Sequence, residues 1–228
     1  MITVIDYGAG NLRSVENTLK FLNVPHGVTS SAEDVSHASA ILLPGVGHFG
    51  QMVRSLEQMR MMSVLRERIQ AGVPYLGICL GMHALFEGSD EAPECGGLGI
   101  FPGMVRRFPE KMPQGLKVPH MGWNQIRLAS GSRLFGNMVP GPLVYFAHSY
   151  YLPREMAADQ PAAGKPLAAA VADYGGEFVA AIESRNVFGT QFHPEKSGNL
   201  GLQVVANFVE ISANDSVQSS RGVARDAG

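Results

Sequence analysis

The first half of the chain alternates short apolar runs with amphipathic stretches, and this pattern constrains the fold more than any other feature of the sequence. Short apolar runs bounded by turn residues are typical of buried strands, whereas apolar residues three and four positions apart indicate helices. Strands and helices that alternate in this way form a parallel sheet with helices on its faces. We therefore expect strands at 2–6, 40–43 and 74–78, and helices at 11–22, with Asn11 as its N-cap, and at 49–70.

The second half has a different pattern, because strand-like segments follow one another with little room for helices between them. Part of the sheet should therefore be antiparallel, and the sequence Tyr174-Gly175-Gly176-Glu177 predicts a hairpin turn. A final helix is expected at 199–211. The expected strands lie at 99–106, 143–151, 167–174, 177–183 and 187–192.

Together these patterns predict an α/β fold of three layers, in which helices cover both faces of a doubly wound mixed sheet. The chain has 228 residues, which is long enough for one substantial core. We expect a single domain over residues 1–211 and a flexible tail over residues 212–228, where Ser, Asn, Asp, Gly and Arg predominate and apolar residues show no period.

Composition excludes several classes of protein. The formal net charge is -2 and no block of basic residues occurs, so we expect neither a nucleic acid nor an anionic membrane as a partner. Only two cysteines are present, too few for a disulfide scaffold, and neither has the spacing of a metal site. The opening residues lack the features of a signal peptide. These observations favour a reduced, cytoplasmic setting and no metal.

One of the cysteines lies at a sharp turn between an expected strand and a helix. Cys79 is flanked by Gly77 and Gly81, which is the pattern of a nucleophile elbow with cysteine in place of serine. The glycines let the strand and the helix pass closely, and a helix N-terminus favours the thiolate. The alternative is a small buried hydrophobe, as most free cysteines are. Cys95 has no such framing and is expected to be structural.

A cysteine nucleophile needs a base, and His193 is the best candidate among the seven histidines. It follows an apolar run and precedes Pro194 and Glu195. Residues i and i+2 of an extended segment point to the same side, so Glu195 can orient the imidazole of His193. The alternative is a turn histidine after a strand. The sequence therefore predicts a Cys-His-Glu triad.

A glycine-rich turn follows the expected strand at 40–43. Residues 45–50 match the pattern G-x-G-x-x-G, which binds dinucleotides when it joins a strand to a helix. A dinucleotide site would also need an acidic residue at the end of the next strand, and that strand ends in Cys79. Two other interpretations remain: the segment is only a tight turn, or its backbone amides point at a developing oxyanion.

These features together resemble the class I, or triad, glutamine amidotransferases, whose fold is flavodoxin-like. The resemblance covers residues 1–211 and rests on the oxyanion turn, the cysteine elbow and the late His-Pro-Glu, in that order. Within the class, the chain is most similar to the glutaminase subunits of imidazole glycerol phosphate synthases, which act in histidine biosynthesis. The matching segments are 6–11, 44–47, 122–124, 145–150 and 191–198.

The resemblance implies a reaction in which Cys79 attacks the side-chain amide of L-glutamine, forms a glutamyl thioester and releases ammonia. His193 would protonate the leaving amine and then activate water, while Glu195 holds the imidazole. The backbone amides of Val46 and Leu80 would bind the oxyanion, a contact worth roughly 100 to 1,000-fold in rate per donor. No cofactor is implied.

The resemblance also implies a glutamine pocket. Glu91 would meet the α-amino group of the substrate, and Gly47 with the backbone of Ser149 and Tyr150 would line the rest. The chain departs from the family at His83, because the elbow helix usually has a glutamine four residues after the nucleophile, in contact with substrate. Glutamine affinity and pH dependence are therefore the properties that this departure puts in doubt.

A partner is implied as well: a cyclase subunit with a β/α-barrel fold, which forms a heterodimer with the glutaminase and receives its ammonia. Trp123, Asn124, Tyr145 and Lys196 match positions that face the cyclase. Other interpretations stay open at these residues, since Trp123 and Tyr145 could be core aromatics and Lys196 a solvated cap.

Two other functions are compatible with the same motifs. One is a different triad enzyme, such as a γ-glutamyl hydrolase or an amidotransferase for another acceptor. The other is a regulatory binding module without turnover, with His83 as the mark of the lost activity. The presence of nucleophile, base and orienting carboxylate favours an enzyme.

Overall fold

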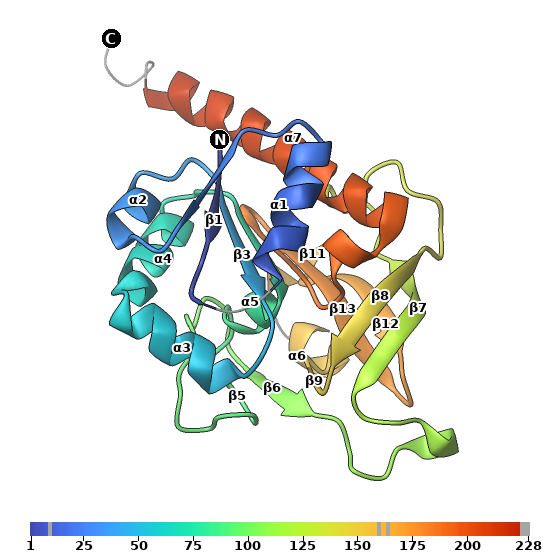
Figure 1. Ribbon diagram of the computed structural model, residues 1–228. Helices are drawn as coiled ribbons and strands as arrows, with labels where there is room; N and C mark the ends of the chain where they lie inside the picture. The colour runs from blue at the N-terminus through green and yellow to red at the C-terminus, as the bar shows by residue number, and fades with distance from the viewer. Residues whose placement is uncertain (9–10, 159–160, 163–164, 224–228) are drawn as a thin grey trace.

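The computed structural model describes residues 1–8, 11–158, 161–162 and 165–223, so residues 9 and 10 of the segment 6–11 and residues 224–228 of the expected tail lie outside it. Within the described residues, nine strands form one sheet (Figure 1). In spatial order they are β2 (His26–Thr29), β1 (Ile2–Ile5), β3 (Ile41–Gly45), β4 (Tyr75–Cys79), β14 (Val187–Thr190), β13 (Glu177–Ser184), β12 (Ala168–Asp173), β7 (His120–Leu128) and β8 (Leu143–His148).

The sheet is mixed, as the sequence predicts. From β2 to β14 each neighbouring pair is parallel, and from β14 to β8 each neighbouring pair is antiparallel. The predicted hairpin turn joins β12 to β13, with Asp173 opposite Glu177. Gly175 and Gly176 both have positive φ, which is what this tight turn requires.

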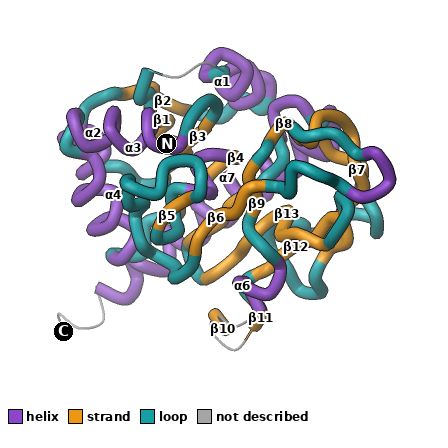
Figure 2. The backbone as a smooth tube through the Cα atoms, turned by 90° about the horizontal axis from the view of Figure 1, so that it is seen from below, coloured by secondary structure: helices purple, strands orange, loops and turns teal. Residues whose placement is uncertain are grey.

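Helices cover both faces of the sheet, which completes the three predicted layers. The helices are α1 (Leu12–Phe21), α2 (Ala32–Ser36), α3 (Phe49–Gln58), α4 (Met61–Gln70), α5 (Leu80–His83), α6 (Arg154–Ala158) and α7 (Gly198–Val223). Figure 1 shows α2, α3 and α4 together on one side of the strands, and α1 and α7 on the other. Figure 2 shows β7 and β8 at the opposite end of the molecule from α2 and α4.

Alternation along the buried strands divides the core in two. In β3, Ile41 and Leu43 belong to the cluster that contains α3 and α4, whereas Leu42 belongs to the cluster that contains α1 and α7. This follows from the period of two along a strand, which sends successive side chains to opposite faces. Both faces are therefore apolar, as expected for the interior of a parallel sheet.

The helix predicted at 49–70 is wrong in one respect, because the chain interrupts it. Met59 caps the end of α3, and Arg60 adopts φ 57, a left-handed conformation that begins α4 in a new direction. Apolar residues recur through both helices, so periodicity alone does not reveal the break.

Several predicted boundaries also shift. The elements that were not predicted include β2 and α2, most of whose residues are only partly buried or exposed, and β7, whose polar and apolar residues alternate. The strand predicted at 99–106 forms only as β6 (Met104–Arg107), and the one at 143–151 is divided into β8 and β9 (Tyr150–Tyr151). Helix α7 continues to Val223, beyond its predicted end at 211.

Small strands complete the fold. β5 (Gly88–Ser89), β6 and β9 form a separate sheet, and β10 (Pro161–Ala162) pairs with β11 (Lys165–Pro166). In the part of the chain that the structure describes, none of the helices combines the length and the apolar character that crossing a bilayer demands.

Candidate active site

The predicted elbow forms at the end of β4. Cys79 is the last residue of this strand and adopts φ 51 and ψ -105, a conformation that L-residues rarely occupy. The flanking glycines are required by close backbone contacts: a Cβ on Gly77 would clash with the backbone of Gly81, and a Cβ on Gly81 would clash with the carbonyl of Leu43. Strand β3, strand β4 and helix α5 therefore meet at the cysteine.

Parallel pairing of β14 with β4 brings His193 to the same place. Thr190 lies opposite Ile78, so the residues that follow each strand leave the sheet at the same edge. His193 Nδ1 lies 2.9 Å from Glu195 Oε1, and both side chains are 2% exposed. The two residues thus form the histidine–carboxylate pair that the sequence predicts.

Cys79 and Glu195 together set the charge of His193. Burial alone would lower the pKa of His193, but the sulfur of Cys79 and the carboxylate of Glu195 outweigh burial and raise it to about 10. The imidazole is therefore protonated at neutral pH and lies next to the sulfur of Cys79. A cationic imidazole beside a cysteine sulfur is an arrangement that can activate the sulfur as a nucleophile.

Asn11 does not act as the predicted side-chain cap of α1. It has φ 75 and makes no side-chain cap hydrogen bond; its Nδ2 instead donates to Glu195 Oε1. The same carboxylate oxygen thus accepts from Asn11 and from His193. Glu195 Oε2 is buried and has no hydrogen-bond partner among the described residues. Asn11 therefore serves the triad, and no local signal in the sequence indicates that contact.

The glycine-rich turn after β3 runs beside the elbow. A Cβ on Gly45 would lie 2.5 Å from the backbone nitrogen of Gly81, and Gly47 has φ 97. The Val46 N–H, an expected oxyanion donor, donates to Tyr7 Oη at 3.2 Å, and Tyr7 Oη donates to the Val46 carbonyl at 3.2 Å. Burial raises the pKa of Tyr7, so its hydroxyl stays neutral and both bonds persist.

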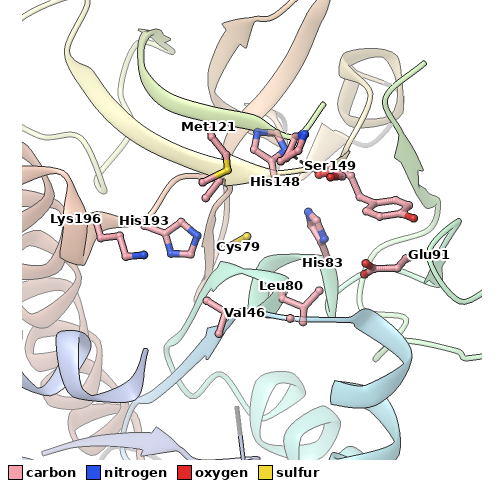
Figure 3. Close-up of a pocket in the computed structure, with 14 residues that line it drawn as sticks. Val46, Cys79, Leu80, His83, Glu91, Met121, His148, Ser149, His193 and Lys196 are labelled. Carbon is pink, nitrogen blue, oxygen red and sulfur yellow. Dashed lines mark hydrogen bonds between the residues drawn. The ribbon is translucent and has the colours of Figure 1, made fainter. Parts of the chain in front are cut away.

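These groups open into a pocket of about 290 Å³ (Figure 3). Figure 3 shows His193 and Lys196 on one side of Cys79, and His83 and Glu91 on the other. Glu195 does not line the pocket, but it contacts His193, which does. Trp123, Asn124 and Tyr145 do not line the pocket either. The predicted residues that line it are Val46, Gly47, Cys79, Leu80, His83, Glu91, Ser149, Tyr150, His193 and Lys196.

Glu91 supplies the negative charge at the far end of the pocket. Its Oε2 accepts a hydrogen bond of 2.8 Å from the Phe49 N–H, at the N-terminus of α3. An acidic side chain at a helix N-terminus interacts favourably with the helix dipole. Glu91 can therefore bind a cationic group on a ligand that also reaches Cys79.

His83 is buried and linked to the nucleophile. Its Nε2 lies 2.7 Å from Gln191 Oε1, and Gln191 Nε2 donates to Cys79 Sγ at 3.6 Å. Burial lowers the pKa of His83 to about 4, so the ring is neutral near pH 7. Gln191 was not among the predicted site residues, although it lies in the matching segment 191–198.

Two further buried histidines were also not predicted: His148 lines the pocket wall, and His120 contacts it from outside the lining. His148 Nδ1 donates to the Tyr150 carbonyl at 2.8 Å, and its Nε2 lies 3.1 Å from His120 Nδ1. Asn124 Nδ2 lies 3.4 Å from His120 Nε2 and donates to the Asp173 carbonyl at 2.8 Å. Burial lowers the pKa of both histidines, that of His120 to about 4. A chain of neutral groups therefore runs from the pocket to β7.

The outer face of β7 and β8 is apolar and exposed. Met121 is 63% exposed, Trp123 57% and Leu143 53%. Trp123 lies opposite Tyr145 and contacts its ring edge-on, with 6.1 Å between centroids, and Lys196 Nζ lies 5.8 Å from the Tyr145 ring centroid. Trp123 is therefore not a core aromatic, and Tyr145 is only half-buried.

Within the described residues, no cluster of His, Cys, Asp and Glu could hold a metal ion.

Comparison with known proteins gives one consistent family. The family model "Glutamine amidotransferase class-I" matches residues 3–211. Imidazole glycerol phosphate synthase subunit HisH of Bacillus cereus is 44% identical over 208 residues, which is 91% of this chain and 93% of the relative. The protein of the same name from Moorella thermoacetica is 43% identical over 211 residues, covering 92% and 94% of the two chains.

Solved structures agree on the fold. One described as a glutamine amidotransferase has a TM-score of 0.68 at 16% identity and covers 93% of this chain and 100% of that one. A protein from Thermoplasma acidophilum, described as part of a putative GMP synthase, has a TM-score of 0.63 at 19% identity, covering 98% and 96%. Because the family model matches residues 3–211 and the HisH relatives are 43% to 44% identical, the chain belongs to the class-I glutamine amidotransferase family.

Proposed function

We propose that this chain is the glutamine-hydrolysing component of imidazole glycerol phosphate synthase and supplies ammonia to a cyclase subunit in histidine biosynthesis. The observation that carries the proposal is the position of Cys79, at a strained elbow beside the His193–Glu195 pair and inside a pocket. The HisH relatives, which match over more than nine-tenths of this chain, support the choice of synthase.

The chemistry follows from the charges in the site. The Cys79 thiolate attacks the side-chain carbonyl carbon of glutamine, and the oxygen gains charge that the N–H groups of Val46 and Leu80 stabilise. The imidazolium of His193 donates its proton to the departing nitrogen, so ammonia leaves and a thioester remains. His193 then takes a proton from water, which attacks the thioester. Glutamate is released, the sulfur is free again, and the net reaction consumes one water.

The pocket suits one small zwitterion. Its volume of about 290 Å³ lies at the lower end of small-molecule sites. Glu91 lies across the pocket from His193, so it binds the α-amino group while the amide reaches Cys79. Gly47 and the backbone of Ser149 and Tyr150 line the walls between these ends, and His83 forms the side next to Cys79.

The outer face of β7 and β8 is the proposed docking surface for the cyclase, with Trp123, Tyr145 and Lys196 as contacts. Asn124, the fourth predicted contact, lies on the other face of β7, where its side chain donates to the Asp173 carbonyl. The outer face is exposed, apolar and continuous with the pocket, because Met121 lines the pocket and Trp123 lies two residues further on the same face. We take the partner to be a β/α barrel in a cytoplasmic heterodimer, with residues 1–211 as the catalytic domain. No cofactor, nucleic acid or membrane is part of this proposal.

The test is reconstitution with the cyclase subunit. The wild-type pair should make imidazole glycerol phosphate from either glutamine or ammonium, whereas Cys79→Ala should work with ammonium alone. Glutamine-dependent synthesis by the Cys79→Ala pair would overturn the proposal. Stimulation of glutaminase by a different acceptor enzyme would favour another triad enzyme. If a glutamine-analogue electrophile failed to label Cys79 with the cyclase present, a regulatory module would be favoured.

A further inference from the structure

His83, Gln191 and Cys79 form a short chain of hydrogen bonds that the proposed mechanism does not use. The three residues come from separate elements: His83 ends α5, Gln191 follows β14, and Cys79 ends β4. All three are buried. The bond between His83 Nε2 and Gln191 Oε1 is 2.7 Å, and that between Gln191 Nε2 and Cys79 Sγ is 3.6 Å.

We propose that His83 is a positioning residue, whose Nε2–H holds the Gln191 carboxamide so that its N–H donates to the sulfur of Cys79. The inference rests on the proposed function, because it assigns a second donor to the same nucleophile. His83 acts through Gln191 and needs no contact with substrate.

The donor at the sulfur fixes the direction of the chain. Gln191 Nε2 donates to Cys79 Sγ, so the N–H₂ group of Gln191 faces the sulfur. Oε1 then faces His83, and a carbonyl oxygen can only accept, so His83 Nε2 must carry the proton.

The remaining nitrogen of His83 agrees with that direction. His83 Nδ1 is buried without a hydrogen-bond partner among the described residues. In the proposed arrangement it is an unprotonated acceptor. The reversed chain would put a proton on Nδ1 and bury an N–H group without an acceptor, which folded proteins rarely tolerate.

This arrangement also explains how histidine can replace the glutamine usual at this position. A glutamine side chain carries an N–H₂ group that could donate to Gln191 Oε1 in the same way, whereas leucine could not. His83→Gln and His83→Leu are therefore a matched pair of similar size that differ in the proposed bond. Gln191→Leu removes the second link.

The experiment measures alkylation of Cys79 by iodoacetamide as a function of pH, in the full chain with Cys95→Ser so that one thiol remains. His193 and Tyr7 are titratable groups that interact with Cys79, and both are unchanged in every variant. A hydrogen bond to a charged group contributes about 1.5 kcal/mol or more, so its loss should raise the midpoint by about one pH unit.

We expect the alkylation midpoint to shift upward in His83→Leu and in Gln191→Leu, and to shift no further in the double variant. In His83→Gln the midpoint should stay within about 0.3 pH units of that of the parent. An unchanged midpoint in His83→Leu would overturn the proposal, and so would shifts that add in the double variant. Circular dichroism establishes that each variant is folded.

A second measurement reads the proton on His83 directly in the unaltered chain. Nitrogen NMR of the protein with labelled histidine reports which ring nitrogen of His83 is protonated, and His83→Gln identifies its signal. A proton on Nε2 is expected, and a proton on Nδ1 would overturn the proposal. Neither experiment uses glutamine or the cyclase, so a failed reconstitution with the cyclase would count against the proposed function alone.

Discussion

The Val46 N–H donates to the hydroxyl of Tyr7, 3.2 Å away, so one of the two amides proposed for the oxyanion hole is already occupied. The same hydroxyl donates back to the Val46 carbonyl. Two hydrogen bonds to one residue hold the turn after β3 in its present orientation, and the substrate oxygen must compete with Tyr7 for this N–H group.

Tyr7→Phe should therefore raise the glutaminase activity of the isolated chain. The substitution removes the competing acceptor and keeps the ring, so we expect kcat to rise about 3- to 10-fold with KM nearly unchanged, within the range of a single oxyanion donor. The measurement is glutamate release without cyclase. A fall in kcat would mean that Tyr7 holds Val46 in the reactive orientation instead.

The stability of the protein should depend on pH through His193. Its pKa rises from 6.5 to about 10 on folding, so the stabilisation is complete below about pH 6.5 and is lost as the pH rises toward 10. Cys79→Ala removes the sulfur that contributes to this rise while burial still lowers the pKa. We expect the wild type to lose stability between about pH 7 and pH 9.5, and Cys79→Ala to lose clearly less.

Urea unfolding at both pH values, followed by circular dichroism, measures this difference. Cys95→Ala is the matched control, because Cys95 accepts a hydrogen bond from Arg54 and lies outside the pocket lining. Equal losses of stability in wild type and Cys79→Ala would show that the sulfur does not hold the proton on His193.

The elbow at Cys79 and the His193–Glu195 pair could be predicted because their signals are local. Two glycines at fixed spacing mark the turn at Cys79, and the i, i+2 spacing places Glu195 beside His193. The contacts that were not predicted depend on which strands become neighbours. Tyr7 meets Val46 only because β1 pairs with β3, and His120 meets His148 only through the register of β7 on β8. Asn11 looked like a helix cap because nothing in its own segment indicates Glu195, far along the chain.

The donor on His148 should control the affinity for glutamine. His148 Nδ1–H fixes the carbonyl of Tyr150 in the pocket wall, and asparagine places an N–H group near the same point, whereas leucine fills the space without a donor. We expect His148→Leu to raise KM for glutamine about tenfold with a smaller effect on kcat, and His148→Asn to retain most of the affinity. Steady-state glutaminase kinetics with cyclase present measure both, and equal values of KM in the two variants would exclude a role for the donor.

The apolar face of β7 and β8 should carry much of the binding energy for the cyclase. Trp123 is 57% exposed and contacts Tyr145, so its truncation removes contact area with the partner while the core stays intact. Central aromatic residues of interfaces typically contribute about 2 kcal/mol or more, so Trp123→Ala should weaken binding roughly 30-fold. Phe21→Ala is the control, because Phe21 is 71% exposed at the end of α1, away from β7 and β8. Calorimetric titration with the cyclase gives both affinities. If Phe21→Ala weakened binding as much as Trp123→Ala, the docking surface would have to be placed elsewhere.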